Sequence, residues 1–171
     1  MNILTSSLPA AVTLEGRCYK IRTDFRTWIL ISEIIGKAGA AGAAAALCYI
    51  DMPPSPRLAL EGIAYFLTRG EKGGAEPLYS FDADADYIYS AFLTQYGIDL
   101  TVSDLHWWKF ISLFRGLGDE HKISKLMALR GLDLNNISDK KLRARLTRLK
   151  RGCAIKRVCD ISAAFDSAGG E

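Results

Sequence analysis

Residues 104–117 (DLHWWKFISLFRGL) constrain the fold most strongly, because they hold two of the three tryptophans and two of the seven phenylalanines. Their large apolar side chains recur at helical spacing and cover most of the circumference of a helix. A helix that is apolar on most sides is a central one. We therefore predict a buried helix here, capped by Ser103 or Asp104 and ended by Gly118, in preference to an exposed binding stripe.

The same spacing argument defines a structural core of large aromatic residues. The predicted core residues are Trp28, Phe92, Trp107, Trp108, Phe110 and Phe114. Truncating either tryptophan of the central helix should cost roughly 3–5 kcal/mol of stability. His106 lies next to these residues without a carboxylate or thiol at helical spacing, so we interpret it as a structural histidine.

Length and composition indicate one soluble globular domain. The chain has 171 residues, of which 49% are hydrophobic and 24% are charged. The longest uncharged apolar run, residues 38–50, is shorter than the roughly 20 residues that a membrane-spanning helix needs. The first 14 residues carry no basic residue and no long apolar stretch. We expect no membrane association and an intracellular protein.

Catalytic and metal-binding motifs are missing from the sequence. The four cysteines form no Cys-x-x-Cys pair, and there are only two histidines. Residues 82–86 (DADAD) resemble the start of a calcium loop, but Tyr87 replaces its glycine and Leu93 its bidentate glutamate. Residues 36–37 lack the serine or threonine of a phosphate loop. We expect no catalytic, metal-binding or cofactor-binding residues, and hence no enzyme.

The expected fold class is mainly α: a single compact helical domain of about six helices with a small N-terminal β-hairpin. The hairpin comes from residues 12–21, which alternate in polarity around Glu15-Gly16. Residues 1–10 are expected to be a flexible arm, 11–158 the domain and 159–171 a frayed tail. The expected helices span residues 24–37, 38–47, a segment after the prolines at 53–56, then 80–97, 103–118, 119–130 and 139–151.

Several of the expected helix starts rest on a polar cap residue. Thr23 or Asp24 caps the first helix, and Ser138 caps the last. Ser80 or Asp82 caps the helix over residues 80–97, with three aspartates in its first turn and Gly97 at its end.

The charge is unevenly distributed along the chain. Residues 1–120 carry 10 basic and 14 acidic residues, whereas residues 121–171 carry 12 and 5. Nine basic residues and no acidic residue lie between positions 140 and 157. Segregation of this kind bears on binding partners more than on the fold.

The basic helix has a narrow apolar stripe made of Leu142, Leu146, Leu149 and Cys153. One interpretation is a solvated helix that docks on the domain through this stripe. The other is a contact surface for an acidic helix or for nucleic acid; the segment lacks the aromatic residues on which single-strand binders stack bases. The candidate partner-binding residues are Arg143, Arg145, Arg148, Lys150 and Arg151.

Several strings in the sequence occur together in one known family. These are DFRTW at 24–28, YSF at 79–81 followed by DADYIY at 84–89, YGIDL at 96–100, LHWWKF at 105–110, and Arg130 with DKK at 139–141. On these strings the chain resembles the bacteriophage "gene product fifteen" family of long-tailed phages and prophages, over about residues 18–157.

The resemblance implies a role in phage tail morphogenesis. It implies a tail assembly chaperone that binds the tape-measure protein non-covalently, together with other tail proteins, and that can form a homo-oligomer. Such a protein acts in the cytoplasm of the bacterial host and is absent from the mature virion. The alternatives are a minor structural component of the tail and, less favoured, a nucleic-acid-binding module that uses the basic C-terminal helix.

Overall fold

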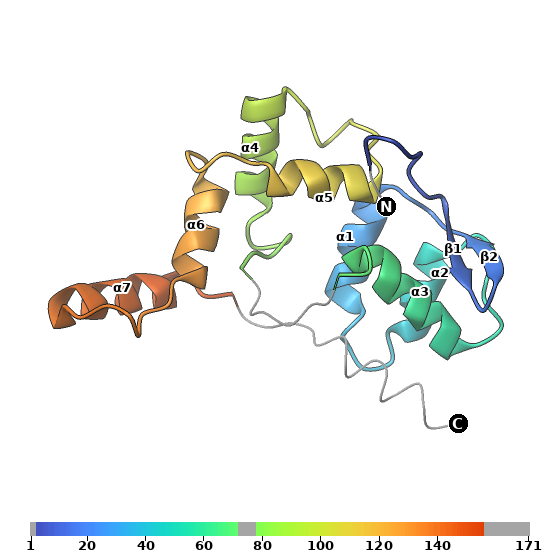
Figure 1. The fold of residues 1–171 in the computed structure, drawn as a ribbon, viewed down its shortest axis with the longest axis horizontal. Helices are drawn as coiled ribbons and strands as arrows, with labels where there is room; N and C mark the ends of the chain where they lie inside the picture. The colour runs from blue at the N-terminus through green and yellow to red at the C-terminus, as the bar shows by residue number, and fades with distance from the viewer. Residues whose placement is uncertain (1–2, 72–77, 156–171) are drawn as a thin grey trace. The chain divides into compact units, whose positions relative to one another are not determined.

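The computed structural model of the chain describes residues 3–71 and 78–155 (Figure 1). These residues form seven helices and one two-stranded antiparallel hairpin, so the predicted mainly α fold is confirmed. This is one helix more than the expected number of about six. Contacts divide the described residues into two compact units, 3–71 with 104–112 and 78–103 with 113–155. A single domain over 11–158 stays a prediction, and the tail at 159–171 lies outside the described residues.

The hairpin of the first unit pairs β1 (Ala11–Leu14) with β2 (Arg17–Lys20). Its two turn residues, Glu15 and Gly16, both have positive φ, 47° and 78°. Positive φ at both positions defines a type I′ turn, whose twist matches that of paired strands. This confirms the hairpin that the alternating pattern predicts.

Two short helices follow the hairpin. α1 (Phe25–Ile34) begins after Asp24, whose side chain accepts a hydrogen bond from the Arg26 amide at 3.0 Å. α1 ends three residues before the expected position, and α2 (Ala41–Cys48) begins only after Gly39, whose φ is +76°. Gly39 separates the two helices because its positive φ is incompatible with a continuous helix, and residues other than glycine reach positive φ only with strain.

The tryptophans of α5 (Trp107–Arg115) donate hydrogen bonds to backbone carbonyls in the last turn of α3 (Pro56–Thr68). The Trp108 indole donates to the Phe66 carbonyl at 2.8 Å, and the Trp107 indole donates to the Leu67 carbonyl at 3.3 Å. Carbonyls in the last turn of a helix have no partner within the helix. The buried indoles therefore satisfy two groups that would otherwise be unpaired in the core.

The aromatic core residues named above are all buried. In the first unit, Phe25 stacks on Phe110 with ring centroids 4.8 Å apart, and Trp28 lies 4.5 Å from Phe66. In the second unit, Phe114 meets Tyr79 edge-on at 4.7 Å. The aromatic side chains of residues 107–114 are thus buried by packing within each unit.

The second unit contains α4 (Ala85–Tyr96), α6 (Lys122–Gly131), α7 (Lys140–Gly152) and residues 113–115 of α5. Gly97 ends α4 in the left-handed conformation with φ of 65°, as its position predicts. The Gly97 amide donates to the Leu93 carbonyl, which is the bond of the αL capping motif, and the Ile98 amide donates to the Phe92 carbonyl.

Three other predicted helix boundaries are wrong. α5 begins after His106 and not after Ser103 or Asp104, and it ends at Arg115. Beyond α5, Gln95 accepts a hydrogen bond from the Gly118 amide and donates to the Gly116 carbonyl, which holds this connection outside the helix. α6 then starts at Lys122, three residues later than expected.

Candidate protein-binding site

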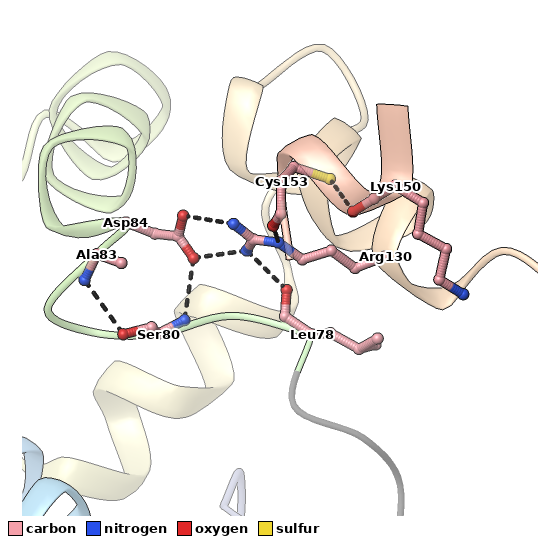
Figure 2. Close-up of polar contacts among 7 residues, drawn as sticks. All are labelled: Leu78, Ser80, Ala83, Asp84, Arg130, Lys150 and Cys153. Carbon is pink, nitrogen blue, oxygen red and sulfur yellow. Dashed lines mark hydrogen bonds and ion pairs between the residues drawn. The ribbon is translucent and has the colours of Figure 1, made fainter. Parts of the chain in front are cut away.

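Arg130, in the last turn of α6, organises the second unit (Figure 2). Its guanidinium binds Asp84 through two parallel contacts, Nη1–Oδ2 at 2.6 Å and Nη2–Oδ1 at 3.0 Å. Nη1 also donates to the Leu78 carbonyl, and Nε donates to the Cys153 carbonyl at 2.6 Å. One side chain therefore joins the segment before α4, the end of α6 and the end of α7.

The pair is buried: Asp84 is 2% exposed, and the Arg130 side chain is nearly covered. The Ser80 amide donates to Asp84 Oδ2 at 2.9 Å. The hydrogen bond to Asp84 holds the pKa of Arg130 above its usual value. Arg130 thus stays charged, and the fork of its guanidinium matches the geometry of the Asp84 carboxylate.

This pair corrects the expected start of α4. Neither Ser80 nor Asp82 is the cap, and Asp86 alone supplies an acidic residue to the first turn. Asp84 occupies the cap position, two residues after Asp82 and four after Ser80, and its carboxylate binds Arg130. Ser80 instead accepts from the Ala83 amide in the turn before the helix.

α7 extends from this centre at the end of α6 (Figure 1). Its cap is Asp139 and not Ser138, because the Asp139 carboxylate accepts from the Lys141 and Leu142 amides. The Lys150 ammonium donates to the Leu132 carbonyl at 2.8 Å. Lys150 therefore helps to hold α7 in place and is only half-exposed.

The other four candidate partner-binding residues, Arg143, Arg145, Arg148 and Arg151, are exposed. None of the 13 residues of α7, all of them described, is buried. Leu142 and Leu149 are 46% and 48% exposed, whereas Leu146 is half-buried. The apolar stripe is thus open over part of its length, and it does not dock fully on the unit.

The sequence predicts a structural role for His106 but not the two hydrogen bonds through which it acts. Its Nδ1 accepts a hydrogen bond from the Trp108 amide at 3.0 Å, and its Nε2 donates to the Pro9 carbonyl at 2.9 Å. This pattern requires the neutral ring with the proton on Nε2. Burial lowers the pKa of His106, and the hydrogen bond to Pro9 opposes that shift. His106 caps α5, a role for which histidine is not a favoured residue.

An apolar hollow of about 240 Å³ lies beside α2 in the first unit. Ala41, Ala45, Pro53 and Ala59 are among its lining residues. Its lining is almost wholly apolar and presents no charged side chain that could orient a ligand. It offers less chemical selectivity than the open face of α7.

Within residues 3–71 and 78–155, no group of three or more His, Cys, Asp or Glu side chains could hold a metal ion. No helix in these ranges has the length and apolar character needed to cross a bilayer. Cys18, Cys48 and Cys153 are free thiols, and Cys159 lies outside the described residues.

These features define a mainly α-helical protein whose most distinctive surface is an exposed, basic, amphipathic helix. Residues 61–155, more than half of the chain, match the family model described as Bacteriophage Gp15 protein, and the chain therefore belongs to this family. The match includes Asp84, Arg130, both tryptophans of α5 and all of α7. Comparison with curated proteins and with solved structures gives no match.

Proposed function

We propose that the chain acts in phage tail morphogenesis as an assembly chaperone that binds the tape-measure protein non-covalently. Membership of the Bacteriophage Gp15 protein family supports a role in a phage. The observation that carries the binding role is the open face of α7, where leucines lie among arginines. A chaperone of this kind needs binding surfaces and no covalent chemistry.

A long helical client explains why such a surface is useful. Before a helical protein is incorporated into an assembly, its apolar face is exposed to water, and the protein can aggregate through that face. An amphipathic helix covers such a face with apolar side chains, while its charged residues set register and partner choice. Fixed charges also speed the encounter with an oppositely charged client.

Co-expression with the tape-measure protein of the same phage tests the proposal. We expect the tape-measure protein to be soluble and to co-purify with the full chain, and to be insoluble when expressed without it. A tape-measure protein that stays insoluble in the presence of the chain, or that is soluble without any association, would overturn the chaperone role.

Mass spectrometry of purified virions separates the chaperone from a structural tail component. A chaperone leaves before the tail is complete, so we expect no peptides of this chain in mature particles. Its presence at a fixed copy number per virion would instead identify it as a minor tail protein.

A further inference from the structure

α7 has the pattern of a coiled-coil seam. Leu142, Leu146, Leu149 and Cys153 are spaced by four, three and four residues, which places them alternately at the d and a positions of a heptad. The helix has 13 residues and is therefore about 20 Å long. An a/d stripe is narrower than the apolar face of a helix that lies on a domain core.

The positions on either side of this seam are basic. In this register Arg143 and Lys150 lie at e, and Arg145 lies at g. Lys150 is bound to the Leu132 carbonyl, whereas Arg143 and Arg145 are exposed. Neither arginine forms an ion pair with any residue of 3–71 or 78–155. The open leucines Leu142 and Leu149 thus lie between two cations that are available to a partner.

A second copy of the chain is a poor occupant of this seam. Parallel pairing would place e of one helix opposite g of the other, and antiparallel pairing would place e opposite e and g opposite g. In parallel pairing Arg145 at g would face Lys150 at e of the second copy, and in antiparallel pairing the basic e positions, Arg143 and Lys150, would face one another. Because like charges at these positions oppose pairing, the seam selects against self-association.

Nucleic acid and membrane surfaces also fit less well. A phosphate backbone would contact the arginines but would leave Leu142 and Leu149 against a polar surface. Helices that lie in a membrane interface bury a broad apolar face with aromatic residues. α7 has neither aromatic residues nor a broad apolar face.

We infer that α7 binds, through Leu142 and Leu149, an amphipathic helix of another protein whose apolar stripe is flanked by aspartate or glutamate. Carboxylates at the flanks of that helix pair with Arg143 and Arg145, while its apolar residues cover the two leucines. The inference rests on the proposed function for the identity of the client, but the chemistry of the seam can be tested without it.

Designed helical peptides provide the test. The first peptide has about three heptads with leucine at a and d and glutamate at e and g. The second differs only in carrying lysine at e and g. Binding to the full chain is measured by fluorescence anisotropy at about 150 mM salt, where surface charges are partly screened. We expect the glutamate peptide to bind at least about tenfold more tightly than the lysine peptide. This ratio corresponds to a difference of about 1.4 kcal/mol in binding free energy.

Two double variants with the same charge change locate the site. Arg143→Glu with Arg145→Glu reverses the e and g positions; Arg148→Glu with Arg151→Glu reverses c and f, on the back of the helix. We expect the first variant to bind the glutamate peptide about tenfold more weakly than the wild-type chain does, and to bind the lysine peptide more tightly. The second should keep the wild-type preference within about threefold. A gain of binding cannot come from misfolding.

Three results would overturn the inference. Equal loss in both variants would indicate unspecific attraction to basic charge, as for nucleic acid. Equal binding of the two peptides to the wild-type chain would remove the role of Arg143 and Arg145. A dimer of the chain that Leu149→Asp dissociates would show that the seam pairs with itself. Failure of the tape-measure co-expression with success here would overturn the proposed client and leave the seam intact.

Discussion

Single residues of the second unit are tied together by the buried Asp84–Arg130 pair. We expect Asp84→Asn to destabilise the protein by roughly 3–5 kcal/mol, because it leaves the Arg130 charge buried without its counter-charge. Asp82→Asn is the matched control, since Asp82 is exposed two residues away; its effect should be below about 0.5 kcal/mol. Urea unfolding measures both, and similar losses in the two variants would contradict the role of the pair.

His106 makes stability depend on pH. Its pKa in the folded chain lies below the ordinary value of 6.5, so the unfolded chain takes up a proton first as pH falls. Its contribution is therefore complete above about pH 6.5 and is lost as pH falls from there through the folded pKa. Protonation of Nδ1 would also break the hydrogen bond from the Trp108 amide.

His106→Asn provides the test, because asparagine can still cap α5 but does not titrate in this range. We expect this variant to lose much of the decline in unfolding free energy that the wild-type chain shows as pH falls below about 6.5. The same pH profile in His106→Asn and the wild-type chain would contradict the assignment.

At the level of elements, the hairpin approaches α3 at Gly62. A Cβ at this position would overlap the Tyr49 hydroxyl, which donates to the Ala59 carbonyl, and would crowd Val12 and Leu14 of β1. We expect Gly62→Ala to cost about 1–3 kcal/mol through overpacking. Gly42→Ala in α2 meets nothing within 4 Å, so it should stabilise by about 0.5–1 kcal/mol. Changes of the same sign in thermal unfolding would contradict this packing.

Local patterns predict several elements because their causes are local. The alternation around Glu15-Gly16, the cap at Asp24 and the left-handed end at Gly97 each depend on a few neighbouring residues. α4 starts later than its sequence indicates because Asp84 pairs with Arg130, 46 residues further along the chain. No spacing rule reveals such a contact, and none identifies His106 as a cap.

In the candidate site too, the features with local causes can be predicted from the sequence, and those that depend on packing cannot. The leucine spacing and basic flanks of α7 are visible in the sequence, since both depend on helical periodicity. Exposure is a property of the packed chain, so Leu142 and Leu149 could equally have been covered. The fixing of Lys150 by the Leu132 carbonyl also depends on packing, and it separates this residue from the four free arginines.

At the scale of the whole molecule, the aromatic residues of α5 pack in the core, and we propose that α7 binds the partner. The tryptophans of α5 are enclosed in the core and use their indole groups to complete α3. α7 is attached through Arg130 and Lys150 and leaves its basic, leucine-containing face open. A chaperone role thus requires the client to change the environment of α7 while the core stays the same.

Hydrogen–deuterium exchange of the full chain, alone and in complex with the tape-measure protein, tests this most directly. We expect slower exchange in the amides of α7 on binding, because a helix held by a partner opens less often. Exchange in α3 and α5 should remain unchanged. A complex that forms while α7 exchanges as fast as before would contradict the account.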